Sequence, residues 1–306
     1  MLVNALELGE GLKDVPVLLV IPGSWSRPVR LKLLRMLLEG IGVGGVYIAE
    51  ASLMAAFGCA TPTALVVDVG QFVCQLTALV EGEAVPGANE MLLLAGKQVD
   101  EYFSARLLHD PITMDSIRGV EPQVMATIED FARAFRESEH SHPSRNSESS
   151  VQPVSFPLAG DISVAIGDSR RTMMDVLFET RQEGPSLIDA LLALLCRCDL
   201  DKRAVLLDHI ILTGGLTRHP LFKSRFEAAL RLRLAASEFA GEFQCKNFRL
   251  RSVPEYYPEI WQRATPMAAW FGGGITAKCV LGDPKNYYTR DDLLHHGSRI
   301  FKEANK

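Results

Sequence analysis

The sequence has no apolar run long enough to cross a lipid bilayer. Its longest apolar segments, such as residues 191–196, fall far short of the roughly 20 residues that a transmembrane helix needs. It also has no surplus of positive charge, because 32 lysines and arginines face 37 aspartates and glutamates and the net charge is −5. We therefore expect no membrane span and no general binding of nucleic acid phosphates.

The sequence also lacks the signals of an exported protein and of a zinc site. Its first ten residues carry acidic rather than basic side chains, and no long apolar core follows them, unlike a secretory signal. The six cysteines include no C-x-x-C pair, and none has a histidine at zinc spacing. These absences predict a cytoplasmic protein with reduced thiols and no metal site.

What the sequence does contain is enough apolar material for a sizeable core. Of its 306 residues 47% are hydrophobic and 23% are charged, which is typical of globular proteins. The apolar run at 15–21 suits a strand covered on both faces of a mainly parallel sheet. Val29, Leu33, Leu37 and Ile41 then recur every four residues, which predicts a helix packed on that sheet. The sequence therefore indicates an α/β protein.

Glycines at 40–45 fit the pattern G-x-G-x-x-G, which is typical of dinucleotide-binding loops. That function requires a strand before the glycines and a helix after them. Here a predicted helix precedes Gly40, and the β-like segment at 46–48 follows. We therefore interpret the glycines as the end of a helix and a turn.

The remaining elements follow from apolar patterns and turn residues. Three β-type runs within 64–85 are broken at Gly70 and Gly82, which predicts two successive hairpins. A buried strand is expected at 206–213 and a less certain extended segment at 153–158. Residues 138–152 contain one apolar residue and predict a disordered surface loop. Helices are expected at about 91–108, 122–137, 168–181, 186–197, 220–236 and 266–280.

Two short segments carry residue types that are suited to phosphate chemistry. One is Asp68-Val-Gly70 between two β runs, and the other is the stretch 213–217, which leaves a buried strand through Gly214 and Gly215. A strand-end aspartate can hold a phosphate-bound metal through water, and glycines let backbone N–H groups approach phosphate. Two tight turns with an aspartate that accepts backbone hydrogen bonds would produce the same pattern. These residues alone leave both interpretations open.

Four segments in a fixed order resemble the actin family. Residues 64–81 are similar to the family's second phosphate hairpin, 211–220 to its adenosine loop, 267–277 to its penultimate helix and 288–297 to its closing helical segment. The order holds from about residue 15 to the end. The resemblance implies an actin-like α/β fold of the Hsp70 and sugar-kinase type, with mixed sheets flanked by helices, in an N-terminally shortened form.

The resemblance also implies how the chain divides into subdomains. Residues 1–58 and 276–306 would form part of the first actin-like subdomain. Residues 59–94 and 185–275 would form the third subdomain, with the phosphate hairpin and the Gly-Gly loop. Residues 95–184, including the loop at about 138–152, would form the fourth.

Three further segments resemble the actin-related proteins at the pointed end of dynactin. They are 156–160, 169–179 and 198–203, in that order. This resemblance implies a structural subunit that caps the actin-related filament and contacts other pointed-end subunits. Such a protein would be cytoplasmic and cytoskeletal and would support dynein-based transport along microtubules.

The family likeness also implies a nucleotide cleft, which we expect to be degenerate. Its residues would be Asp68, Gly70, the loop 214–216 (Gly214, Gly215, Leu216) and Asp130, and it would bind ATP or ADP passively if it binds nucleotide. For Asp130 and its neighbour Glu129, a solvated helix face explains the sequence at least as well, because two acids repel phosphates and no lysine lies nearby.

Departures from the family pattern predict that the protein is not an enzyme. The first phosphate loop would precede the region where this chain begins. The second loop, expected as Asp-x-Gly-Asp/Thr-Gly, has Gln71 and Phe72 at its last two positions. Counting from Asp68 puts Ala51 where a side chain would orient water, with Glu50 out of phase by one residue. These losses should lower ATP hydrolysis by several orders of magnitude.

Two other functions stay open at this point. One is an active ATPase or phosphotransferase of the actin-like superfamily, which the intact Gly214-Gly215 pair favours. The other is an actin-related subunit of a chromatin remodeller. In addition, the aromatic segment 256–261 could either pack on the molecule or anchor a partner.

Overall fold

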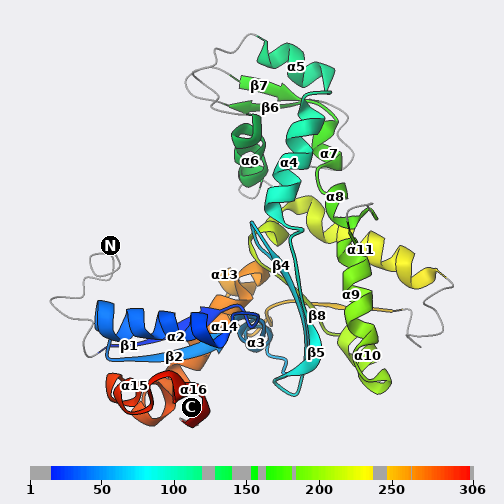
Figure 1. Cartoon of the computed structure of the whole chain (residues 1–306). Coiled ribbons are helices and arrows are strands. Elements are labelled where there is room, and N and C mark those ends of the chain that lie inside the picture. The colour runs from blue at the N-terminus through cyan, green and yellow to red at the C-terminus, as the bar shows by residue number, and fades with distance from the viewer. Residues whose placement is uncertain are drawn as a thin grey trace.

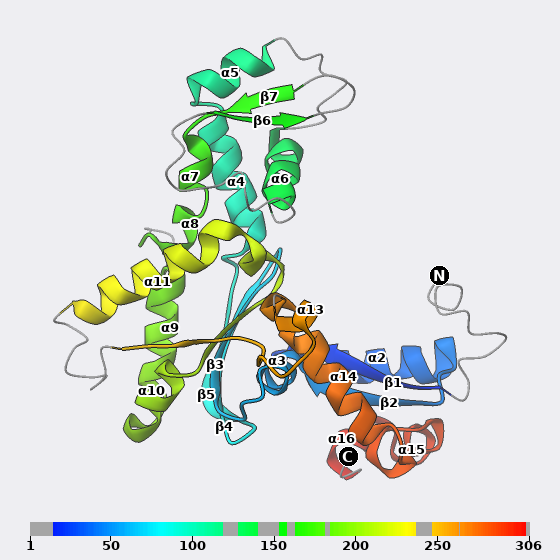
Figure 2. The ribbon, with the colours of Figure 1, turned by 180° about the vertical axis from the view of Figure 1, so that it is seen from behind.

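The computed structural model describes residues 15–118, 128–139, 153–157, 163–180, 184–236, 247–262 and 264–303. Figures 1 and 2 show three lobes that diverge from a central sheet, with the first and the last described elements in the same lobe. No helix in these ranges has both the length and the apolarity needed to cross a membrane.

The central sheet is mixed, as expected. Across the described residues its strand order is β5-β4-β3-β8-β9. The strands β3 (Ala64–Val69), β4 (Cys74–Val80) and β5 (Glu83–Leu92) form the two predicted hairpins, while β8 (Ile210–Thr213) lies parallel to β3 and β9 (Leu250–Arg251) parallel to β8. Every residue of β8 is buried, so this sheet is covered on both faces at its centre.

The first lobe contains the predicted N-terminal strand and helix. Strand β1 (Pro16–Ile21) pairs in parallel with β2 (Gly45–Glu50), and α2 (Arg27–Arg35) continues into a π-helical turn at Met36–Ile41. Gly42 ends that turn with φ +80°, which confirms a helix end rather than a dinucleotide loop. Helices α15 (Arg290–His296) and α16 (Ile300–Glu303) complete the lobe, whose core contains Leu34, Leu38, Val46, Tyr288, Leu293 and Ile300.

Two helices join this lobe to the sheet. Helix α3 (Ala51–Gly58) follows β2, and α14 (Ala268–Val280) crosses it after the short helices α13 (Glu259–Gln262) and η5 (Thr265–Met267). The helices touch through their backbones, because a Cβ atom added at Gly272 would lie 2.7 Å from the carbonyl carbon of Met54. Alanines 55 and 56 of α3 and Phe271 of α14 are buried with Val66 and Ile211 of the sheet.

The upper lobe in Figure 1 lies beyond the end of the sheet at which β3 turns into β4 and β5 leads into α4. Its helices are α4 (Gly96–Leu107), α5 (Pro111–Ile117), α6 (Ile128–Glu139), α7 (Ser169–Thr172) and α8 (Asp175–Phe178), and its hairpin consists of β6 (Val154–Pro157) and β7 (Ser163–Ile166). Rings of Phe103, Phe131, Phe135 and Phe156 pack edge-on or tilted between α4, α6 and β6. Of the predicted loop at 138–152, residues 138 and 139 lie in α6 and 140–152 lie outside the described residues.

The third lobe is helical. Helix α9 (Leu187–Cys196), expected at 186–197, begins with a capping box between Ser186 and Asp189, and most of its residues are buried. Helices α10 (Leu200–Leu207) and α11 (Pro220–Ala235) pack around it. The stacked rings of Phe222 and Phe226 fix α11 against α8.

Three predicted boundaries are wrong. The strand expected at 206–213 begins only at Ile210, because α10 continues through Leu207. The helix expected at 168–181 is divided into α7 and α8 by a turn at Met173 and Met174, and both of these side chains are fully buried in the core. The helix expected from 91 begins at Gly96, since residues 91 and 92 end β5. In each case packing in three dimensions outweighed the local apolar pattern.

Candidate functional site

Asp68 and Gly214 meet at the carboxyl ends of β3 and β8. The two strands are parallel, and Asp68 lies opposite Thr213 in their register. Gly214 has φ +94°, and a Cβ added there would overlap the Asp68 carboxylate and lie 2.5 Å from the carbonyl oxygen of Val69. Only glycine fits this conformation and this space. The structure thus brings three predicted site residues, Asp68, Gly214 and Gly215, to one point.

The Asp68 carboxylate lies where its environment disfavours the charged form. Burial raises the pKa of Asp68 above its ordinary value, because desolvation penalises the charged form. Within the described ranges no hydrogen bond to its carboxylate is found. The residue is half-buried, and a bound cation is one group that would neutralise its carboxylate.

The turn after Asp68 is fixed to the upper lobe. The Gly70 N–H donates to the carbonyl of Val73 at 3.0 Å. The carbonyls of Gly70 and Gln71 accept hydrogen bonds from the N–H groups of Gly96 and Lys97 at 3.0 and 2.6 Å. The first turn of α4 is therefore docked on this hairpin, and Gly70 serves the turn itself. Phe72, at the tip, is 68% exposed.

A buried polar network that the sequence analysis missed holds Gln71 in place. The Gln71 amide donates to Oδ2 of Asp100 at 2.7 Å and its carbonyl oxygen accepts from Nη2 of Arg136 at 2.8 Å. Nε of Arg136 lies 2.6 Å from Oδ1 of Asp100, and both side chains are at least 96% buried. The signal was present: Asp100 falls on the apolar face that Val99 and Phe103 give to this helix.

Replacing Arg136 by methionine is expected to lower the free energy of unfolding by about 3 kcal/mol. The substitution keeps most of the side-chain volume but leaves the Asp100 carboxylate buried without its cation. Urea denaturation measures the change. Arg133→Met is the matched control, because Arg133 is 47% exposed and lies 3.7 Å from Asp100, so its loss should cost less than about 1 kcal/mol. Equal losses in both variants would contradict the prediction.

Asp130 lies away from the sheet that carries Asp68 and Gly214. It is half exposed on α6 in the upper lobe, and Oδ1 lies 3.6 Å from Nη1 of Arg133. Arg133 in turn faces Asp100. No lysine lies near this acid in the sequence, but Arg133 supplies the positive charge that balances it. Asp130 therefore belongs to the ionic network of the upper lobe.

The Gly-Gly loop continues as a short 3₁₀ helix, η4 (Gly215–Arg218). Thr217 closes it, because its N–H and its hydroxyl donate to the carbonyl of Gly214 at 3.2 and 2.8 Å. The Leu216 side chain is 2% exposed and packs in the core. Leu216 can therefore contribute to a site only through its backbone and not through its side chain.

A small pocket lies beside this loop. Its volume is about 180 Å³, and its lining residues are Leu212, Thr217, Lys223, Leu250, Arg251, Ser252, Thr265 and Pro266. Pockets for small organic ligands have about 300 to 1,000 Å³, so this one could hold part of such a ligand. Lys223 and Arg251 were missed by the sequence analysis, because nothing in the local pattern relates them to the Gly-Gly loop.

Ala51, where the family pattern would place a water-orienting side chain, follows directly on a polar residue at the end of β2. Ala51 is the first residue of α3, whereas Glu50 is the last residue of β2. Oε1 of Glu50 accepts a hydrogen bond from Nη2 of Arg30 at 2.8 Å, and a Cβ added at Gly23 would lie 2.8 Å from Oε2. The polar group at this strand end is therefore the Glu50 carboxylate, paired with a guanidinium.

Asp68→Asn is expected to stabilise the folded protein at neutral pH. The raised pKa of Asp68 means that the unfolded chain releases this proton first as pH rises, so ionisation works against folding above the unfolded value of about 4. The stability difference between variant and wild type should therefore vanish at acid pH and be largest above the folded pKa. Urea denaturation from about pH 3 to about pH 8 measures this difference in the free energy of unfolding. A variant that is less stable than wild type at neutral pH would contradict the prediction.

Comparison with known proteins decides what these elements belong to. A sequence profile described as Actin matches residues 3–281. The chain belongs to the actin family. It is 23% identical over 301 residues to "Actin-related protein 2" of Arabidopsis thaliana, an alignment that covers 95% of this chain and 74% of that protein. To "Actin-related protein 2" of Oryza sativa subsp. japonica it is 22% identical over 285 residues, covering 90% and 69%.

For this actin-related protein, the geometry fits a nucleotide from one side of the cleft. Asp68 could hold a cation, which would supply charge neutralisation for phosphates. Gly215 has open space at its Cβ position, which would let a ligand approach the backbone there, whereas the space at Gly214 is filled by Asp68 and Val69. The hairpin turn fits less well, because Phe72 places a ring at its tip and Gln71 is occupied by Asp100 and Arg136.

Proposed function

We propose that this actin-related protein is a structural subunit without ATPase activity, and that any ATP or ADP in its cleft is held without turnover. The observation that carries the proposal is the turn after Asp68. Its backbone carbonyls and the Gln71 side chain are committed to the upper lobe. It therefore acts as a structural joint between the sheet and α4.

Phosphoryl transfer depends almost entirely on positioning and on charge stabilisation. A phosphate at this turn would meet the ring of Phe72 where close backbone approach requires glycine. The polar group at the end of β2 is a carboxylate in an ion pair with Arg30, and a carboxylate repels phosphate oxygens. Both features support a loss of several orders of magnitude in rate.

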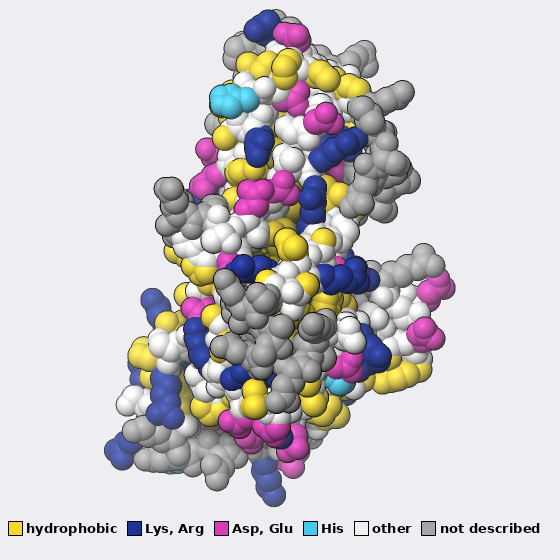
Figure 3. All heavy atoms as spheres, turned by 90° about the vertical axis from the view of Figure 1, so that its right-hand side faces the viewer, with side chains coloured by type: hydrophobic (Ala, Val, Ile, Leu, Met, Phe, Trp, Pro, Cys, Tyr) yellow, Lys and Arg dark blue, Asp and Glu magenta, His cyan; other side chains and the backbone are white. Residues whose placement is uncertain are grey.

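We further propose that the protein caps the pointed end of the actin-related filament in dynactin, as actin-related protein ten or eleven does, in the cytoplasm and on the cytoskeleton. The support is the ordered resemblance of 156–160, 169–179 and 198–203. Basic and acidic side chains are interspersed on the face shown in Figure 3. Such a surface suits contacts with filament subunits and other pointed-end subunits better than contacts with nucleic acid.

An active ATPase or phosphotransferase is the second candidate. The feature that favours it is the half-buried Asp68 carboxylate, which lies beside the tight Gly214 turn and whose pKa is raised by desolvation. Carboxylates with perturbed pKa values are enriched at functional sites. The two candidate functions differ in the expected rate of ATP hydrolysis, which can be measured.

The decisive assay is phosphate release from ATP and Mg²⁺ by the purified protein. We expect no release above buffer, with the same result for wild type, Asp68→Asn and Phe72→Gly. Nucleotide binding is measured separately by equilibrium dialysis with ADP, so that passive binding is not mistaken for turnover. Turnover in the wild type that Asp68→Asn abolishes would establish the enzyme instead.

The assembly role is tested by affinity capture of the tagged full chain from the cytosol of its own source organism. We expect dynactin subunits to be recovered, identified by mass spectrometry. The matched control is Gly272→Ala, which should be destabilised by overlap with the backbone of Met54 and should lose these partners. Recovery of chromatin-remodeller subunits in place of dynactin would overturn the proposal.

A further inference from the structure

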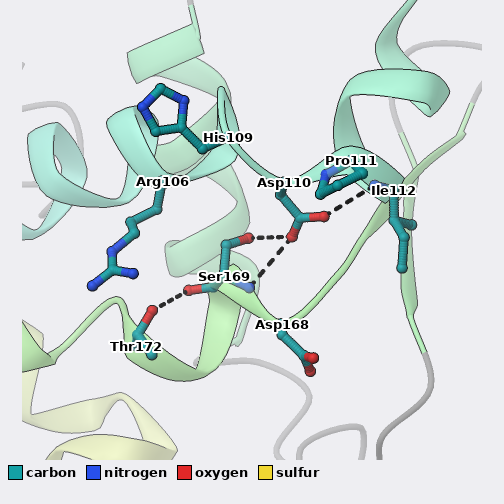
Figure 4. A pocket seen from close by; sticks show the side chains of 8 residues that line it. All are labelled: Arg106, His109, Asp110, Pro111, Ile112, Asp168, Ser169 and Thr172. Carbon is teal, nitrogen blue, oxygen red and sulfur yellow. Dashed lines mark hydrogen bonds between the residues drawn. The ribbon is translucent and has the colours of Figure 1, made fainter.

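We propose that a pocket in the upper lobe binds a ligand that carries a carboxylate or phosphate beside an apolar group. The pocket lies between the end of α4, the start of α5 and α7 (Figure 4). It is remote from the Asp68–Gly214 site, so this inference does not depend on the proposed function.

The pocket has the size of a small-molecule site. Its volume is about 400 Å³, within the roughly 300 to 1,000 Å³ of known ligand pockets. Eight residues line it: Arg106, His109, Asp110, Pro111, Ile112, Asp168, Ser169 and Thr172. Figure 4 shows that Arg106 and His109 come from one wall, while Ser169 and Thr172 come from the other.

The Asp110 carboxylate is part of the pocket wall. It caps α5 by accepting hydrogen bonds from the N–H groups of Ile112 and Thr113 at 3.1 and 3.3 Å. It also accepts from the N–H and the hydroxyl of Ser169 at 3.3 and 2.8 Å. Burial alone would raise the pKa of Asp110, but these hydrogen bonds outweigh it and lower the pKa. Asp110 is thus ionised, and its carboxylate is already hydrogen-bonded to donors of the protein.

The other carboxylate of the pocket is also compensated. Oδ1 of Asp168 lies 3.5 Å from Nε of Arg171, and the Asp168 side chain is 78% exposed at the rim. Thr172 donates its hydroxyl proton to the carbonyl of Ser169 at 3.2 Å. The groups that remain to meet a ligand are therefore the cationic Arg106 and the imidazole of His109.

Arg106 is held in position for an anion. Its guanidinium lies 5.0 Å from the centre of the Tyr102 ring, and Nε donates to the Tyr102 hydroxyl at 3.1 Å. The hydrogen bond with Tyr102, together with the nearby Asp175 and Glu179 carboxylates, raises the pKa of Arg106. Asp175 is itself paired with Arg225 at 3.7 Å. A guanidinium fixed by a ring keeps further N–H groups for a carboxylate or phosphate.

The apolar part of the ligand follows from the other lining residues. Pro111 and Ile112 form an apolar edge at the start of α5, and Ile112 is 44% exposed. A ligand that pairs an aromatic or aliphatic group with an anion would bury this side chain while its charge meets Arg106.

The test is calorimetric titration of the full chain with phenyl phosphate and with benzoate, and with phenol as the uncharged analogue. We expect saturable binding of one equivalent of at least one anion and no saturable binding of phenol. The two anions distinguish a phosphate ligand from a carboxylate ligand. Saturable binding of phenol as tight as that of the anions would overturn the proposal.

Variants locate the binding. Arg106→Gln should weaken it at least about tenfold, which corresponds to one charge-assisted contact. Arg118→Gln is the matched control, an exposed arginine of the same lobe that pairs with Asp115, and Asp68→Asn reports on the nucleotide cleft; both should bind like wild type. If Arg106→Gln has a lowered thermal midpoint, His109→Gln replaces it. Unchanged affinity in a folded pocket variant, or no saturable binding of either anion, would refute the site.

Discussion

Gly272→Ala is expected to lower the free energy of unfolding by about 4 kcal/mol, a large part of the roughly 5 to 15 kcal/mol by which native proteins are stable. The added methyl group would overlap the carbonyl of Met54 and lie 2.8 Å from the backbone nitrogen of Gly58. These are backbone atoms, so no rotamer change relieves the overlap, and α3 and α14 must separate. Urea denaturation followed by circular dichroism measures the loss.

Gly274→Ala in the same helix is the control for this prediction. Gly274 is exposed, and nothing lies within 4 Å of a Cβ added there. Alanine should stabilise α14 at this position by about 0.5 to 1 kcal/mol, because it restricts the unfolded chain. If both variants change stability in the same direction, the helices do not cross through Gly272.

Gly214→Ala is expected to cost a similar amount, about 4 kcal/mol. Gly214 has φ +94° and ψ 161°, a region that is nearly restricted to glycine. A methyl group would in addition overlap the carboxylate of Asp68 and approach the carbonyl of Val69. Strain and overlap act together here, and neither can relax without separating β3 from β8.

The neighbouring Gly215→Ala separates this effect from a general sensitivity of the loop. Gly215 is exposed and has open space at its Cβ position. Its replacement should change stability by less than about 0.5 kcal/mol. Equal destabilisation by the two substitutions, measured by the same denaturation experiment, would show that the loop tolerates no side chain for a reason other than contact with Asp68.

Much of the fold could be predicted because local patterns and packing agree. The run at 15–21, the hairpins at 64–85 and the capped helix after Ser186 appear where the sequence indicated them. In these segments the apolar period, the turn residues and the caps all favour the same structure. The family likeness then supplied the mixed sheet, which local patterns alone do not give.

The site was predictable only where it lies on contiguous residues. Asp68 and the Gly214-Gly215 pair were found, because each ends a recognisable strand. Asp100 and Arg136 were missed, since they are 36 residues apart and meet only when α4 packs on α6. The upper-lobe pocket depends likewise on two segments, 106–112 and 168–172, that no local pattern connects. Long-range placement of polar groups requires the fold itself.

Docking of α4 on the hairpin tip has a mechanical consequence. Main-chain hydrogen bonds from Gly96 and Lys97 to the tip, reinforced by Gln71 and Arg136, join the upper lobe to the sheet. Any rotation of that lobe must therefore also move the turn that follows Asp68. A force applied to the upper lobe would reach this turn by the same route.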